Sequence, residues 1–127
     1  MNFKEWAQKT VSFDFDGVLH TDMIPSTHHP TSYDETDLAP NEPILKKVIE
    51  EAKFNKIIVV SARPKWCIPV IEAFIEKHKL PIQDVFATDN GPKLPILKKM
   101  NVIRHYDDSP KIGRELEGSG IEFILIQ

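Results

Sequence analysis

Residues 11–18 read VSFDFDGV, a short apolar run that ends in two aspartates and a glycine. Asp14 and Asp16 are spaced i, i+2, and side chains at this spacing point to the same side of a strand. Both carboxylates are therefore expected to leave the strand tip together, where Gly17 breaks the run. Such a pair suits Mg²⁺, a hard cation that prefers oxygen ligands, and it places a nucleophile beside a proton donor.

Length and composition predict a single soluble domain. The chain has 127 residues, of which 41% are hydrophobic and 28% are charged, values that are ordinary for a globular protein. We expect one domain over residues 1–127, with a long loop of about 19–41 that is rich in Pro, His and acidic residues. The net charge of -3 gives no general attraction to nucleic acid or to an anionic membrane.

Cysteine content and hydropathy indicate the compartment. Cys67 is the only cysteine, so the chain has neither an internal disulfide nor a cysteine zinc site, which favours a reducing environment. The N-terminus lacks the apolar stretch of a signal peptide, and no apolar run has transmembrane length. We therefore expect a cytoplasmic protein with no membrane partner.

Strand and helix patterns alternate along the chain. Strands are expected at 10–15, 56–60, 84–87, 101–106 and 121–126, and helices at 43–52, after Pro64, at 92–100 and at 111–117, with a brief amphipathic segment at Phe3 and Trp6. Alternation of this kind predicts βαβ units and a parallel sheet with helices on both faces. Trp66, near the end of the second strand, is expected in the core, and the alternative is that it stacks on a base of the substrate.

The polar residues that carry chemistry fall at one edge of this sheet. Ligands bind at the carboxyl ends of the strands in such folds. Strand ends carry Asp14 and Asp16, then Ser61, then Asp107 and Asp108, and Lys93 opens the helix before the fourth strand. Each residue alone also fits a structural role, such as a helix cap for Ser61 or a solvated lysine for Lys93. The convergence of all of them favours a site.

Phosphoryl transfer accounts for these residues. It needs a nucleophile, and Asp14 is the candidate, forming an aspartyl-phosphate. Asp16 would protonate the leaving oxygen and then activate water, provided that the site raises its pKa. Mg²⁺ would be held by Asp14, by the backbone carbonyl of Asp16, and by Asp107 or Asp108. The hydroxyl of Ser61 and the ammonium of Lys93 would hold phosphate oxygens.

These residues resemble the four motifs of the haloacid dehalogenase (HAD) superfamily. The matching residues are Asp14-Phe15-Asp16-Gly17-Val18, then Ser61, then Lys93, then Asp107-Asp108, and the match spans about residues 10–126. The resemblance implies a Rossmann-like, three-layer α/β/α fold with a mainly parallel five-stranded sheet. It also implies Mg²⁺-dependent phosphatase chemistry, with phosphate contacts at Ser61, Ala62, Arg63 and Lys93.

The chain is too short between its motifs to hold the cap domain of larger family members. Capless members tend to act on phosphate groups of macromolecules, or to cover the site by oligomerisation. The substrate classes that remain open are a nucleotide, a nucleic-acid end and a small metabolite. The loop histidines His20, His28 and His29 fit contact with substrate, contact with a second metal, or simple exposure to solvent. Arg63 and Lys65 are expected at the rim, either drawing in an anionic substrate or as ordinary surface charges.

Two other hypotheses for the function of these residues remain open. A non-catalytic or regulatory module on the same fold would use the site for binding alone. A phosphoacceptor receiver domain also clusters aspartates with a lysine, but it carries the accepting aspartate at the end of the third strand. At that place this chain has only Asp89, beyond Ala87 and Thr88.

Overall fold

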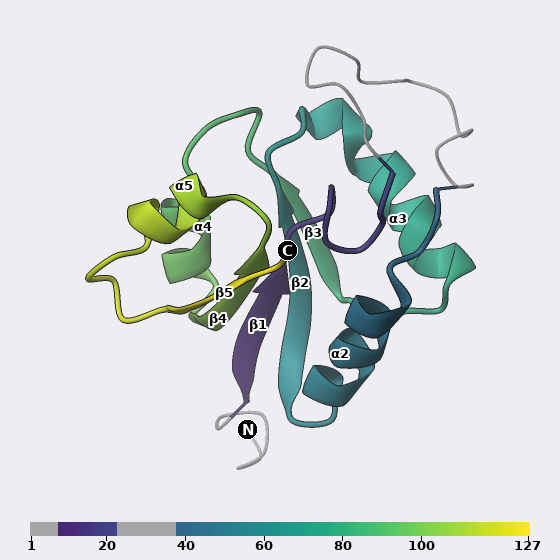
Figure 1. Ribbon diagram of the computed structural model, residues 1–127, viewed down its shortest axis with the longest axis horizontal. Coiled ribbons are helices and arrows are strands. Elements are labelled where there is room, and N and C mark those ends of the chain that lie inside the picture. The colour runs from purple at the N-terminus through teal and green to yellow at the C-terminus, as the bar shows by residue number, and fades with distance from the viewer. Residues whose placement is uncertain (1–7, 23–37) are drawn as a thin grey trace.

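The computed structural model describes residues 8–22 and 38–127 (Figure 1). The strands are β1 (Lys9–Phe13), β2 (Asn55–Ser61), β3 (Asp84–Ala87), β4 (Val102–Asp107) and β5 (Glu122–Leu125). The helices are α2 (Glu42–Ala52), the short 3₁₀ helix η2 (Lys65–Cys67), α3 (Ile68–Lys77), α4 (Leu94–Lys99) and α5 (Pro110–Glu115). Every strand and helix expected within the described residues is present.

The sheet has five parallel strands in the order β3-β2-β1-β4-β5. From the central strand β1 the chain builds β2 and β3 on one side, and then β4 and β5 on the other. The direction of winding therefore reverses between β1 and β4, and a crevice at the carboxyl ends of two such strands is where ligands bind in open α/β sheets. The expected Rossmann-like α/β fold is confirmed.

Helices cover both faces of the sheet, and each face has its own core. In Figure 1, α2 and α3 lie on one side of the strands and α4 and α5 on the other. Val11, Phe13 and Val59 belong to the core under α2 and α3, whereas Ile58 and Val60 belong to the core under α4 and α5. Strand β2 is thus buried on both faces, as its continuous β-branched run predicts.

The first strand ends earlier than its apolar pattern predicts. Strand β1 stops at Phe13, whereas the expected strand ran to residue 15. The N–H of Asp14 still bonds to the carbonyl of Tyr106 in β4, and the chain then closes one helical turn, with the N–H groups of Val18 and Leu19 bonded to the carbonyl of Phe15. Because Phe15 is fully buried in this turn, it looks like a strand residue in the sequence.

The described ends of the long loop are joined to each other. The N–H of Thr21 bonds to the carbonyl of Ala39, and the N–H of Asn41 bonds to that of Leu19. We call these paired segments, residues 19–22 and 38–41, the loop stem. His28, His29 and the amphipathic segment at Phe3 and Trp6 lie outside the described residues.

Trp66 lies at the surface. The prediction that it lies in the core is wrong, because 49% of this residue is exposed. It lies in η2, where its neighbour Cys67 is the residue that turns inward and is buried.

Across residues 8–22 and 38–127, no helix has the length and apolar character needed to span a membrane.

Candidate active site

Three acidic side chains meet at the carboxyl ends of β1 and β4. Within the described part of the chain, Asp14, Asp107 and Asp108 each place a carboxylate oxygen within 4.8 Å of the others. Asp14 and Asp107 are buried and Asp108 is exposed. We call these three residues the acid cluster. The structure therefore brings together acids from the first and fourth motifs at the reversal of winding, whereas Asp89, beyond β3, does not belong to the cluster.

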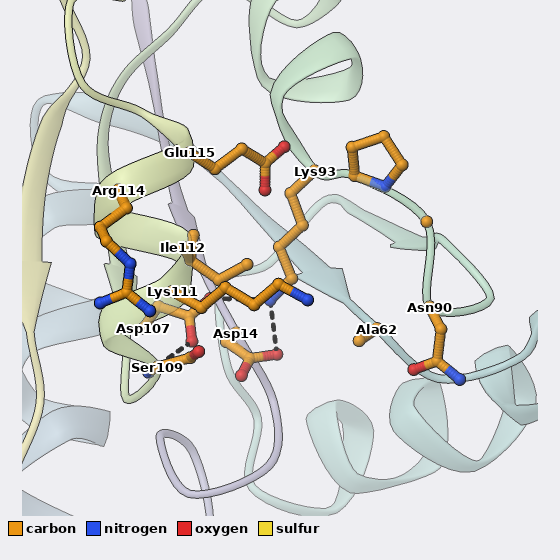
Figure 2. Close-up of a pocket in the computed structure, with 12 residues that line it drawn as sticks. Asp14, Ala62, Asn90, Lys93, Asp107, Ser109, Lys111, Ile112, Arg114 and Glu115 are labelled. Atoms are coloured by element: carbon orange, nitrogen blue, oxygen red, sulfur yellow. Dashed lines mark hydrogen bonds and ion pairs between the residues drawn. The ribbon is translucent and has the colours of Figure 1, made fainter.

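A buried lysine compensates the charge of the acid cluster. The Nζ atom of Lys93 lies 3.1 Å from Oδ1 of Asp14 and 2.7 Å from Oδ2 of Asp107 (Figure 2). Only 2% of Lys93 is exposed. Burial opposes its charge, but the attraction of Asp14 and Asp107 outweighs burial, and the pKa of Lys93 is raised. Lys93 is thus an ammonium ion held between two strands.

The two buried acids of the cluster differ in proton affinity. Burial raises the pKa of Asp14 to about 8, against the opposing attraction of Lys93. Asp107 is also buried, but a hydrogen bond from His105 and the charge of Lys93 hold its pKa at about 2. In the metal-free protein, Asp107 is therefore the carboxylate that neutralises Lys93, and Asp14 retains a proton near neutral pH.

Ser12 and His105 form a polar chain behind Asp107, and sequence reasoning missed both residues. Nε2 of His105 lies 2.9 Å from Oδ2 of Asp107, and Nδ1 lies 2.6 Å from Oγ of Ser12. Because the carboxylate only accepts, Nε2 carries the hydrogen and Nδ1 accepts from the Ser12 hydroxyl. Burial lowers the pKa of His105, which keeps the ring neutral. The sequence does contain a signal for them: Ser12 is spaced i, i+2 from Asp14, and His105 is spaced i, i+2 from Asp107, which places each on the same side of its strand as the acid.

Asp16 is not part of the acid cluster and is held by two other side chains. Nε and Nη2 of Arg63 donate to the two carboxylate oxygens of Asp16 over 2.8 and 2.7 Å. Nε2 of His20 lies 2.8 Å from Oδ1 of Asp16, so His20 meets this acid rather than solvent. Burial opposes the charge of Asp16, but the bonds from His20 and Arg63 dominate, and its pKa is lowered.

Two expectations are corrected by this clamp. Arg63 does not stand at an exposed rim: it is 2% exposed, and its guanidinium lies 5.1 Å from the ring centroid of Phe15. The raised pKa on which the acid role of Asp16 depends is also not found in this conformation, because a bidentate guanidinium stabilises the carboxylate. Of the two motif-one acids, it is Asp14 whose pKa is raised.

The second motif lies at the end of β2. Ser61 is buried, and its Oγ accepts the N–H of Arg63 over 3.1 Å, which leaves the hydroxyl hydrogen to donate elsewhere. Ala62 is exposed, and its carbonyl accepts the N–H of Asn90. The next loop, which carries Asn90, is thereby tied to the second motif.

A cavity of about 700 Å³ opens beside the acid cluster (Figure 2). Asp14, Lys93 and Asp107 line one end of it, Ala62 and Asn90 line another part, and residues of α5 line the wall that faces them. This volume falls within the range of small-molecule sites in proteins. Asp14 is thus largely buried, and the cavity that it lines is large enough for a ligand.

The acid cluster fits a hard divalent cation. Carboxylate oxygens from three residues provide the ligands that Mg²⁺ prefers. Gly17 makes room for one of them: its φ is +74°, and a Cβ built there would lie 2.9 Å from Cγ of Asp108 and closer still to Oδ2. Burial and the charge of Asp107 raise the pKa of Asp108, so a cation nearby would relieve the repulsion. The carboxylate of Asp16 is not part of this set.

Comparisons with known proteins found similarity at the level of fold. No protein-family model and no curated protein sequence matches the chain. The solved structures that are similar to it include one titled "Structure of the Pnkp1/Rnl/Hen1 RNA repair complex" (TM-score 0.70, 18% identity) and one titled "Structure of Pnkp1/Rnl/Hen1 complex" (TM-score 0.72, 15% identity). Each match covers 94% of this chain but only 42% and 46% of the matched chains, so this chain spans less than half their length.

The raised pKa of Asp14 predicts a pH dependence of stability. Its ordinary value is 3.8 and its folded value is about 8, so between these pH values the folded state binds the proton more tightly than the unfolded state. The free energy of unfolding of the metal-free protein should therefore fall as pH rises, by at most about 1.4 kcal/mol per pH unit from this group. Asp14→Asn should remove that slope and be the more stable protein at pH 8.

Urea unfolding in EDTA at pH 5 and pH 8 measures this difference, since the other titrating groups are common to both proteins. Asp84→Asn is the control, because Asp84 is a half-exposed acid outside the cluster. Equal slopes in wild type and Asp14→Asn would contradict the assignment.

Gly17→Ala should weaken metal binding. The added Cβ displaces the Asp108 carboxylate, so the Kd for Mg²⁺ should rise by about tenfold, the lower end of the range for disturbed metal shells. Gly118→Ala is a matched control, since φ at Gly118 is +75° but a Cβ there meets nothing within 4 Å. Titration calorimetry with Mg²⁺ distinguishes the two, and similar affinities in both variants would argue against Asp108 as a ligand.

Proposed function

We propose that the chain is a Mg²⁺-dependent phosphomonoesterase of the HAD type, in which Asp14 is the nucleophile. The observation that carries this proposal is the position of Asp14: it is buried, it opens on a ligand-sized cavity, and it lies within reach of Lys93 and two further acids. Phosphoryl transfer by covalent catalysis needs each of these parts.

In the first half of the reaction, an oxygen of the Asp14 carboxylate attacks phosphorus. The new O–P bond forms as the bond from phosphorus to the leaving alcohol breaks, and the leaving oxygen takes a proton. In the second half, water attacks the aspartyl-phosphate, the bond from Asp14 to phosphorus breaks, and inorganic phosphate leaves. The ammonium of Lys93 and the hydroxyl of Ser61 stabilise the phosphoryl oxygens.

Asp14, Asp107 and Asp108 would hold the metal, together with the backbone carbonyl of Asp16. A bound Mg²⁺ supplies neutralisation of the charge on the phosphoryl group. It also lowers the pKa of Asp14, because a positive charge favours the carboxylate that attack requires. Ser12 and His105 orient Asp107 in this arrangement.

Asp16 is the proposed proton carrier, and its neighbours set a condition on that role. Held by Arg63 and His20 it is a carboxylate, the form that accepts a proton from the attacking water, but the same clamp lowers its pKa and weakens it as a base. To donate a proton in the first half, it must exchange the guanidinium of Arg63 for a proton and turn toward the leaving oxygen. An incoming dianionic phosphate provides the driving force, since it raises the proton affinity of a nearby acid.

The substrate class proposed is a nucleotide or a terminal phosphate of a nucleic acid. One of the two similar structures is titled as an RNA repair complex, and the net charge of -3 permits recognition of a short terminus rather than a long duplex. The non-catalytic alternative is favoured by one observation, the lowered pKa of Asp16 in its clamp.

The proposal predicts that Asp14→Asn abolishes phosphate release. With Mg²⁺ present, turnover of p-nitrophenyl phosphate, nucleotides and 3′- or 5′-phosphorylated oligonucleotides should fall by roughly 10⁴-fold, the scale found when a covalent nucleophile is removed elsewhere. Asp84→Asn should keep wild-type turnover. Full activity in Asp14→Asn would exclude it as the nucleophile, and a wild type that binds Mg²⁺ but turns over no ester would favour the binding module.

Asp16→Asn should discriminate between leaving groups. An alkyl phosphate, whose alcohol leaves only with a proton, should lose about 10²–10⁴-fold in kcat, the contribution of general acid catalysis. p-Nitrophenyl phosphate should lose much less, because its leaving group departs as an anion. Steady-state kinetics on both esters gives the ratio, and equal losses would assign the defect to the broken Arg63 clamp.

A further inference from the structure

We propose that Lys111 and Arg114 bind a second phosphate group of the substrate. The first phosphate is the one transferred to Asp14, and the second is carried by the leaving alcohol. The inference rests on the proposed function and narrows its substrate class. The chemistry recognised is a phosphate or phosphodiester anion one sugar away from the phosphomonoester that is cleaved. A nucleoside 3′,5′-bisphosphate and a phosphorylated nucleic-acid end both present this pattern.

Both cations stand on one face of α5, and that face is a wall of the cavity. Lys111 and Arg114 are spaced i, i+3, which places their side chains beside each other on a helix. Both line the same cavity as Asp14, and Figure 2 shows them on its α5 side. A ligand whose scissile phosphate lies at Asp14 thus has two cations along the wall of the same opening.

No described acidic side chain forms an ion pair with either cation. Within residues 8–22 and 38–127, the side chains of Lys111 and Arg114 have no ion-pair or hydrogen-bond partner. Glu115 lies on the same helix, but its Oε2 accepts the N–H of Leu94 over 2.9 Å. Like charges at i, i+3 repel, and an anion placed between them would offset that repulsion. The chain is acidic as a whole, so two free cations here do not belong to a general basic surface.

The catalytic lysine cannot serve a second anion. Lys93 is already bonded to Asp14 and Asp107, and it is almost wholly buried. Cleaving a simple monoester therefore requires the acid cluster, the metal and Lys93, but not the two cations of α5. The presence of Lys111 and Arg114 in the cavity is explained if the ligand carries a further negative group.

The rest of the cavity fits what would join the two phosphates. Pro92 and Ile112 also line it, and they offer apolar contact to a sugar or base. At about 700 Å³, the cavity is far larger than one phosphate requires and is in the range of nucleotide-sized ligands.

The test compares thymidine 3′-monophosphate with thymidine 3′,5′-bisphosphate by phosphate release in Mg²⁺. Wild type should prefer the bisphosphate in kcat/KM by about tenfold, the scale of one or two charge-assisted hydrogen bonds. Lys111→Gln with Arg114→Gln should reduce this preference to near unity. The control Lys98→Gln with Lys99→Gln removes the same charge from exposed positions of α4 outside the cavity and should keep the preference.

A second arm separates the two sources of the anion. A 3′-phosphorylated oligothymidylate replaces the bisphosphate, so that a phosphodiester stands in place of the 5′-phosphate. A preference for the oligonucleotide that the double variant loses identifies a nucleic-acid end, whereas a preference confined to the bisphosphate identifies a small metabolite. Added NaCl should weaken either preference, because exposed charges are screened.

Failure of this inference is distinct from failure of the proposed function. If wild type and both double variants cleave the monophosphate and bisphosphate with the same ratio, the second site is overturned and the phosphatase stands. If wild type cleaves neither, the proposed function fails, and calorimetry with the bisphosphate decides the inference. Tighter binding to wild type than to the Lys111/Arg114 variant supports the second site, and equal affinity overturns it.

Discussion

The ammonium of Lys93 is the constraint on which the site depends. Two buried acids on neighbouring parallel strands would repel each other, and burying an unpaired charge costs several kcal/mol, roughly. Lys93 enters from the start of α4 and bonds to both, so the loop after β3, the central strand and β4 are joined at one atom. Lys93 keeps Asp107 charged, whereas burial and the charge of Asp107 raise the pKa of Asp14 against the attraction of Lys93. A divalent cation at the acid cluster would complete the neutralisation.

Asp14 and Asp16 show how neighbours give two identical side chains different chemistry. They are two positions apart, yet burial raises the pKa of one, and a guanidinium with an imidazole lowers the pKa of the other. Asp14 meets its partners at the cavity, whereas Asp16 meets Arg63 and His20 away from the acid cluster. The different proton affinities of the two acids are therefore a property of the surrounding elements, β4 and α4 for Asp14 and the β2 loop for Asp16, and the proposed roles of nucleophile and proton carrier rest on this difference.

The fold and the acid cluster were largely predictable from sequence, because periodicity and strand ends are local signals. The apolar run of β2 predicts a strand that is buried on both faces, and Asp107 is the last residue of β4, directly after its apolar run. The clamp on Asp16 was not predictable, since Arg63 lies 47 residues away and its direction depends on how the β2 loop turns. Ser12 and His105 were hidden for the opposite reason: within apolar strands they look like lead-in residues, and only the pairing of β1 with β4 brings them together.

The loop stem has a consequence for how this scaffold can vary. His20 reaches Asp16 from inside the stem, and the bonds from Thr21 to Ala39 and from Asn41 to Leu19 close the chain beyond it. Lengthening a flexible loop beyond a closed stem adds only about 0.6 kcal/mol for each doubling of its length. Segments of different length and composition can thus be exchanged past Thr21 while the imidazole on Asp16 stays in place. The stem acts as a graft point, where new recognition elements can be added to an unchanged chemical centre.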